Sequence, residues 1–184
     1  MKLKYLFAFV MVFGIVLTAC AAEPEEDYDY IRIRWEYLST GRTGLILTHT
    51  DLTDEEIAPL RYMTNLTNLR LENSQVSDLT PLAGLINLTS LSLGFNQISD
   101  ITPIANLTNL RILDLTDNQI SDITPLAGLT DLAVLILSDN QITDITPLAG
   151  LPNFTGDNSM LVLDGNPISD WSPVEDFANV VGRP

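Results

Sequence analysis

Leucine and isoleucine recur along the chain with a fixed spacing. The segment LILSDNQITDITPLAGL (135–151) repeats LDLTDNQISDITPLAGL (113–129) with few changes. Two earlier copies begin at Leu69 and Leu91, so four successive copies start 22 residues apart, and a divergent copy begins at Leu161, four residues late. A fixed period of this size indicates a solenoid built from stacked copies of one unit.

Within each unit the pattern predicts a strand, a turn and a short helical turn. Leu-x-Leu alternates, which is typical of a strand with one buried face. Thr-Pro follows in four copies, and we expect the threonine to cap a helical turn that begins at the proline. We expect a C-terminal cap of that turn at Gly84, Gly128 and Gly150, and at Asn106 in the matching place of the remaining copy. One unit exposes too little apolar surface to offset the entropy of ordering 22 residues, so the units must stack on one another.

Two polar columns accompany the apolar repeat. An asparagine follows the strand in four copies, and we expect its amide to bond backbone groups of adjacent coils. An aspartate precedes each Thr-Pro or Ser-Pro, and we expect it to accept hydrogen bonds from the N–H groups of the helical turn. Calcium bridging between coils is the alternative role for the aspartates. The columns are Asn96, Asn118, Asn140 and Asn166, and Asp78, Asp100, Asp122, Asp144 and Asp170.

The shared pattern LxxLxLxxNxIxDIxPLxxL resembles the leucine-rich repeat in its 22-residue bacterial form. Over residues 45–177 the chain is similar to the internalin family, although it has fewer repeats than the larger members. The resemblance implies an α/β solenoid of about six coils, with parallel strands on the concave face and short 3-10 or helical turns on the convex face. Known members are cell-surface proteins, and several bind host receptors through the concave face. The resemblance therefore implies a binding function.

The first residues predict export. Lys2 and Lys4 precede an apolar run that is too short to span a bilayer, which is typical of a signal peptide at 1–19. Leu-Thr-Ala-Cys resembles a bacterial lipobox, and lipidation of Cys20, the single cysteine, explains an otherwise lone thiol. We expect a lipid-anchored protein at the bacterial cell surface. The alternative is an ordinary signal peptide and a secreted protein.

The ends of the mature chain predict a tether and two caps. Residues 20–29 are acidic and indicate a tether between the anchor and the domain. Residues 30–44 contain the alternating run YIRIRWEY, which predicts a strand that caps the first coil, with a docking strand for a partner as the alternative. We expect Trp171 and Phe177 to cover the last coil, and residues 178–184 to form a C-terminal tail.

The charge narrows the choice of partner. The chain carries a formal charge of −15, and loss of the two signal-peptide lysines takes it to −17. Nucleic acid is excluded as a ligand because its binding needs a positive surface, whereas a basic partner is attracted at long range. Catalysis has little support, because the sequence holds one His, His49, and no metal-spaced cluster or phosphate loop. We expect no enzyme activity, no cofactor, no metal and a monomer.

The residues between the strand leucines are predicted to line the concave face, since side chains alternate along a strand. In the later coils these positions are apolar and are bordered by aspartates, as in many protein interfaces, although β-branched residues are also simply good strand formers. Phe95 is a separate candidate anchor. The predicted partner-binding residues are Phe95, Ile112, Asp114, Asp117, Val134, Ile136, Asp139, Met160, Val162 and Asp164.

Two functions remain open at this point. The first is a lipid-anchored module that binds a protein or peptide through its concave face. The second is a structural envelope protein that spaces surface components and has no specific ligand.

Overall fold

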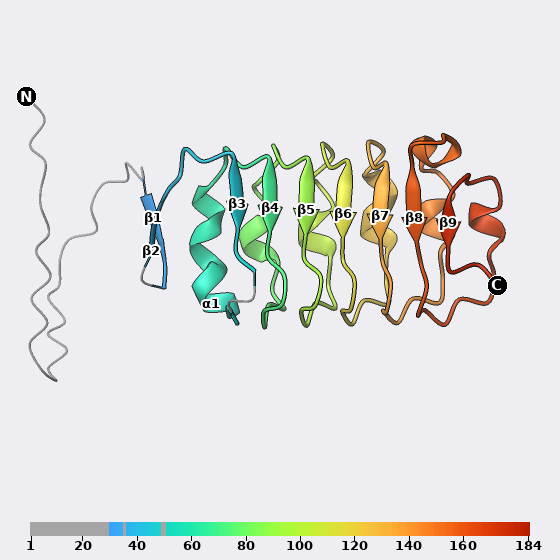
Figure 1. Cartoon of the computed structure of the whole chain (residues 1–184), viewed down its shortest axis with the longest axis horizontal. Coiled ribbons are helices and arrows are strands. Elements are labelled where there is room, and N and C mark those ends of the chain that lie inside the picture. The colour runs from blue at the N-terminus through green and yellow to red at the C-terminus, as the bar shows by residue number, and fades with distance from the viewer. Residues whose placement is uncertain (1–29, 35, 49–50) are drawn as a thin grey trace, which may run out of the picture.

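The computed structural model describes residues 30–34, 36–48 and 51–184. In this part of the chain seven parallel strands stand side by side in sequence order, and helical turns line the opposite side of the stack (Figure 1). The strands are β3 (Gly44–Ile46), β4 (Asn68–Arg70), β5 (Ser90–Ser92), β6 (Ile112–Asp114), β7 (Val134–Ile136), β8 (Met160–Val162) and β9 (Val180–Val181). The helical turns are α1 (Asp54–Ile57) and the 3-10 helices η1 (Ala58–Tyr62), η2 (Thr80–Leu82), η3 (Thr102–Ile104), η4 (Thr124–Gly128), η5 (Thr146–Leu148), η6 (Pro152–Thr155) and η7 (Ser172–Val174). The predicted solenoid is confirmed.

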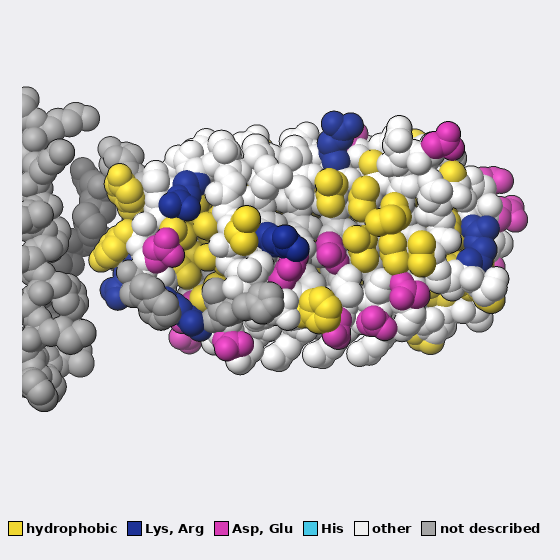
Figure 2. Space-filling model, viewed as in Figure 1, with side chains coloured by type: hydrophobic (Ala, Val, Ile, Leu, Met, Phe, Trp, Pro, Cys, Tyr) yellow, Lys and Arg dark blue, Asp and Glu magenta, His cyan; other side chains and the backbone are white. Residues whose placement is uncertain are grey.

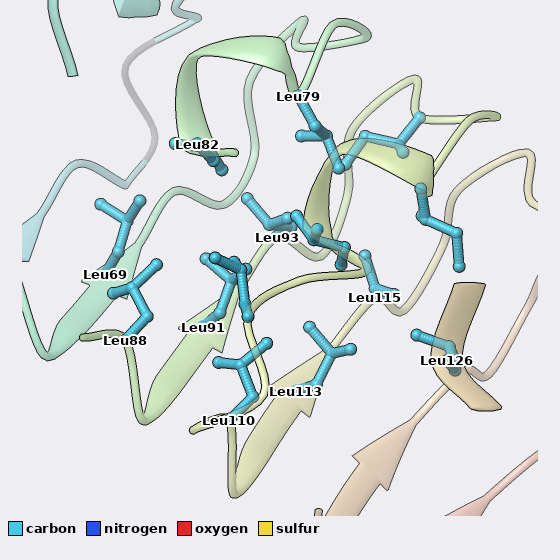
Figure 3. Packing of buried hydrophobic residues seen from close by; sticks show 14 of the residues in the cluster. Leu69, Leu79, Leu82, Leu88, Leu91, Leu93, Leu110, Leu113, Leu115 and Leu126 are labelled. Atoms are coloured by element: carbon cyan, nitrogen blue, oxygen red, sulfur yellow. The ribbon is translucent and has the colours of Figure 1, made fainter. Parts of the chain in front are cut away.

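The register of the sheet places each leucine beside its equivalent in the next coil. Leu69 pairs with Leu91, and Leu91 with Leu113. Their side chains point into the interior, where they meet leucines from the helical turns, such as Leu82 and Leu126 (Figure 3). Each such side chain contributes roughly 1.5–3 kcal/mol on burial. The coils therefore share one continuous core.

A two-stranded antiparallel hairpin covers the first coil. It consists of β1 (Tyr30–Ile33) and β2 (Glu36–Ser39), and it buries Ile31, Ile33 and Leu38 in the same core as the repeats. Arg34 fastens the hairpin to the solenoid, since its Nε lies 2.8 Å from Glu56 Oε1 and its Nη2 donates to the Asp51 carbonyl oxygen at 3.0 Å.

The last coil departs from the regular repeat. The extra residues near Gly156 follow η6, whose Phe154 is buried and stacks on Phe177 at 5.4 Å between ring centroids. Val180 and Val181 then pair with Leu161 and Val162 and add a seventh strand to the sheet. This strand lies within 178–184, which the sequence pattern alone marks as a tail because Leu-x-Leu is missing there.

The helical turns begin and end differently from the sequence-based expectation. Threonine is the first residue of the 3-10 turn rather than its cap, because the aspartate two residues earlier already receives the first N–H. Gly84, Gly128 and Gly150 are not left-handed, since the only described glycines with positive φ are Gly165 and Gly182. The turn closes instead through the next leucine, as when Leu85 N–H donates to the Leu82 oxygen at 3.0 Å. The expected threonine and glycine caps are therefore wrong.

Candidate binding surface

An asparagine ladder fixes the bend after each strand. The Asn118 Oδ1 accepts the Ile98 N–H of the preceding coil at 3.0 Å, and Nδ2 donates to the Leu93 and Leu115 oxygens, each at 3.1 Å. Asn96, Asn140 and Asn166 make the equivalent bonds. Backbone groups buried at the bend are thereby paired, which avoids the penalty of leaving them without partners. The ladder predicted from sequence is confirmed.

The aspartate column holds the start of each 3-10 turn. Asp100 Oδ1 accepts the Thr102 N–H at 2.8 Å, and the same bond recurs at Asp78, Asp122, Asp144 and Asp170. The hydroxyl and the backbone N–H of the same threonine lower the pKa of Asp100, Asp122 and Asp144. The predicted hydrogen-bonding role is confirmed. Among the described residues, no group of three or more His, Cys, Asp or Glu is arranged to hold a metal ion.

A second column, next to the asparagines, has left-handed backbone. Its members are Asp51, Asn73, Phe95, Asp117, Asp139 and Gly165, with φ between 48° and 72°. Asn, Asp and Gly tolerate this conformation, whereas a bulky side chain there is a genuine outlier. At Gly165 an added Cβ would lie 2.9 Å from the backbone nitrogen of Asp139 as well as 2.2 Å from its Oδ1, so a side chain there would force both backbone and side chain of Asp139 to shift. Phe95 is the exception in the column, and the residue is 50% exposed.

The first coil is two residues longer than the regular repeat between its strand and the left-handed residue. Leu45 pairs with Leu69, 24 residues later, whereas the left-handed residues Asp51 and Asn73 are 22 residues apart. His49, the single histidine of the sequence, lies outside the described residues. Cys20 also lies outside them.

Apolar side chains gather on the strand face, which we define as the outward-facing side chains of β3 to β9. Over β6 to β8 these are Ile112, Val134, Ile136, Met160 and Val162, which we name the apolar patch. Ile112 is 45% and Met160 38% exposed, and the other three are half-buried. Figure 2 shows a hydrophobic cluster over this part of the sheet. Val181 on β9, half exposed, extends the patch by one strand and was missed because its segment carries no repeat motif.

Aspartates border the apolar patch on the side where the strands end (Figure 2). Asp114 is held by the Thr116 hydroxyl at 2.7 Å, and Asp164 by the Ser138 hydroxyl at 2.7 Å. Asp117 and Asp139 are exposed at the bend. The structure thus brings nine of the ten predicted residues into one apolar area and its acidic border, and Phe95 lies one coil away from them.

The first half of the strand face has a different character. Arg70 Nε lies 2.7 Å from Glu72 Oε1, and the same carboxylate oxygen accepts a hydrogen bond from the Ser92 hydroxyl. These polar groups already form hydrogen bonds with one another, so a ligand that binds them gains less free energy than it would from unpaired groups. The larger group of apolar side chains on the strand face therefore lies over β6 to β9, while Ile46 on β3 is a separate exposed apolar side chain.

The chain has the leucine-rich-repeat fold. Its parallel strands follow in 22-residue steps, an asparagine ladder bonds neighbouring coils, and 3-10 turns line the opposite side. The family model described as Leucine Rich repeats (2 copies) matches residues 86–128. Proteins built from this repeat, internalins and receptors among them, typically mediate protein–protein interactions as non-enzymatic scaffolds. No curated protein sequence matches the chain.

Solved structures share the fold. An internalin, inlF, from Listeria monocytogenes is 30% identical with a TM-score of 0.60, and the match covers 79% of this chain and 49% of that one. The chain thus spans about half the length of that internalin. A leucine-rich-repeat protein of Leptospira interrogans is 24% identical with a TM-score of 0.67, covering 77% and 37%. The plant peptide hormone receptor RGFR1, solved in complex with RGF2, is 22% identical with a TM-score of 0.60, covering 78% and 25%.

No helix in the described part of the chain is both long enough and apolar enough to cross a bilayer. Internalin-like neighbours are bacterial surface or secreted proteins.

Proposed function

We propose that the chain is a bacterial cell-surface protein, anchored through a lipid on Cys20, that binds a protein or peptide partner on its strand face. The apolar patch carries this proposal. It forms the centre of the contact, and Asp114, Asp117, Asp139 and Asp164 form an acidic rim that favours a partner with basic side chains. Phe95 supplies a separate aromatic anchor.

The exposure of the patch supports binding over a purely structural role. Ile112 and Met160 leave large apolar surfaces in water at positions where the earlier coils carry Asn68 and Ser90. The outward positions of β4 and β5 carry polar residues, so the repeat itself does not require apolar side chains there. Covering the patch with a partner recovers roughly 25 cal/mol for each Å² of apolar surface removed from water.

Two aspartates placed in the patch test this function. The Val134→Asp/Ile136→Asp variant is expected to abolish capture of a partner from envelope extracts by the immobilised chain, with an unchanged circular dichroism spectrum. Ile86→Asp is the matched control, because Ile86 is 56% exposed but lies in the turn before β5, outside the strand face. Equal capture by all three proteins contradicts binding at the patch, and no specific capture by the wild type favours the envelope-spacer function.

The anchor is tested separately. Cells that express the wild type are expected to incorporate labelled palmitate into the chain, and Cys20→Ala is expected to remove the label. Undiminished labelling of the variant contradicts lipidation of Cys20. A variant that is unlabelled but still captures the partner separates the anchor from the binding surface.

A further inference from the structure

The apolar patch and Val181 form two rows that cross the strands. The sheet register places the members of each row side by side on neighbouring strands. One row consists of Ile112, Val134 and Met160, and the other of Ile136, Val162 and Val181. The rows lie two residues apart along each strand, which is roughly 6.7 Å, whereas together they cross three strand spacings of roughly 4.8 Å each. The apolar surface is therefore longer across the strands than along them.

This surface offers a partner apolar side chains but no backbone groups. The N–H and C=O groups of β7 pair with β6 on one side and with β8 on the other. An extended segment pressed onto the patch would bring its own peptide groups against apolar side chains, where N–H and C=O groups without partners are costly. An α-helix pairs these groups internally, so it needs only an apolar stripe to cover the patch.

The spacing of the strands also favours a helix. Side chains within each row recur at the strand spacing of roughly 4.8 Å. A helix laid across the strands presents one apolar side chain per turn, roughly every 5.4 Å. An extended segment presents one side chain on the same face roughly every 6.7 Å. Over three strand spacings the mismatch reaches roughly 2 Å for the helix and roughly 6 Å for the extended segment, so the helix stays closer in step with the rows.

The two long sides of the patch differ in charge. Four aspartates border it on the side where the strands end (Figure 2), namely Asp114, Asp117, Asp139 and Asp164. On the other side, Asp131 and Asp157 precede β7 and β8 by three residues, and Arg111 directly precedes β6. The formal charge is therefore −4 on the first side and −1 on the second. Lys or Arg along one flank of a helix would be attracted to the first side.

A second copy of the chain does not offer such a helix from its described residues. Three turns, or about eleven residues, are needed to cross three strand spacings. In the described part of the chain, α1 is the single α-helix and has four residues. Two copies would also bring their acidic borders together. The occupant is therefore a different protein.

We propose that the partner presents an amphipathic α-helix of about three turns, which lies across β6 to β9 with its axis perpendicular to the strands. Its apolar stripe covers both rows of the patch. Lys or Arg side chains along one flank reach the border formed by Asp114, Asp117, Asp139 and Asp164. This occupant rests on the proposed binding function, which by itself leaves the shape of the partner open.

Two fluorescein-labelled peptides of the same Leu, Lys, Ala and Gln composition test the shape of the occupant. In one, Leu recurs at helical spacing and Lys lies along one flank; in the other, Leu alternates with polar residues. Fluorescence anisotropy is expected to show that the full chain binds the helical peptide at least about tenfold more tightly. Circular dichroism is expected to show that this peptide gains helicity on binding. Equal or tighter binding of the alternating peptide, or no binding of the helical one, overturns the proposal.

Variants place the peptide on the patch. Ile136→Ser is expected to weaken binding of the helical peptide about tenfold, because it removes apolar contact. Ile46→Ser is the matched control, since Ile46 holds the same place on β3, is 71% exposed and lies outside the patch. Asp117→Asn/Asp139→Asn keeps residue types that tolerate left-handed backbone and should reduce the salt dependence of binding. Equal affinity of the wild type and Ile136→Ser overturns the proposal, as does an unchanged salt dependence in the double variant.

The failure of the helix and the failure of the binding function give different results. If the alternating peptide binds more tightly and Ile136→Ser weakens that binding, the strand face still binds a partner and only the helix is wrong. If neither peptide binds, the helix is wrong, and capture of a partner from envelope extracts decides the binding function separately.

Discussion

At the scale of single residues, Phe95 stands out because its backbone is left-handed, with a φ of 59°, in a column otherwise made of Asp, Asn and Gly. For an ordinary L-residue this conformation costs roughly 1–2 kcal/mol. Phe95 is half exposed, so packing offsets this energy less than it would for a buried side chain. Strain that is kept at an exposed side chain is consistent with a role in binding.

Replacing this phenylalanine should therefore stabilise the fold. We expect Phe95→Asn to raise the free energy of unfolding by about 0.5–1 kcal/mol, because asparagine adopts the left-handed region at lower cost. Phe95→Leu is the control, since it removes the ring without relieving the backbone. Urea denaturation of the three proteins measures the difference. If the asparagine variant is no more stable than the leucine variant, the backbone at this position carries no strain.

At the scale of elements, the aspartate before each 3-10 turn makes folding depend on pH. The pKa of Asp100, Asp122, Asp144 and Asp170 lies below the usual value of 3.8 in the folded chain, mainly because Thr or Ser hydroxyl and backbone N–H groups donate to the carboxylates. The unfolded chain therefore binds these protons at a higher pH than the folded chain does. The resulting stability is present above about pH 4 to 5 and is lost as the pH falls through the lowered folded pKa values.

A variant with asparagine at all four positions tests this coupling. Asn can still accept the N–H bond but cannot take up a proton. We expect its free energy of unfolding to fall less steeply than that of the wild type between pH 5 and pH 2.5. Urea denaturation at several pH values measures the slopes, and Asp131→Asn, at an exposed position in the turn before β7, is the matched control. Parallel slopes in the quadruple variant and the wild type would contradict the coupling.

Element prediction succeeds where the repeat is regular and fails where it is not. Residues that recur at one spacing predicted the Leu-x-Leu strands, the asparagine ladder at Asn118 and the hydrogen bonds of Asp122. They did so because each recurring position has the same neighbours in the stack. β9 could not be predicted, since Asn-Val-Val-Gly lacks the motif and forms a strand only because β8 offers it a partner. The helix caps were misassigned because Thr-Pro and Gly satisfy rules for α-helices, whereas the turns are single 3-10 turns.

The binding surface is predictable to a similar extent. Alternation along each strand places Ile112, Val134 and Met160 on the outer side of the sheet, and the structure has them there. The left-handed backbone of Phe95 could not be inferred from a phenylalanine, because only its place in the column of Asp and Asn residues reveals it. Val181 required the tertiary pairing of β9.

At the scale of the whole molecule, each coil contacts only its neighbours, so the solenoid should tolerate the loss of one complete unit. Excision of residues 118–139 joins Asp117 to Asn140, which keeps a left-handed residue followed by a ladder asparagine at the junction. β6 then meets β8, and Ile101 and Ile104 face Ile145 and Leu148 in place of Ile123 and Leu126. The removed coil buries Ile120, Ile123, Leu126, Leu129, Leu132, Leu135 and Leu137, and this loss lowers stability without changing the fold.

We expect the 22-residue excision to give a protein that unfolds cooperatively, with a lower Tm and a circular dichroism spectrum of the same shape. Excision of residues 118–128 alone is the control, because it removes η4 but leaves β7. The repeat that remains is half a unit long, so the leucines of the later coils no longer align with those of the earlier coils and cannot pack in one core. That shorter deletion should yield an unfolded or aggregated chain. If both deletions unfold the protein, the coils are not interchangeable units, and stability must come from contacts that a nearest-neighbour stack does not contain.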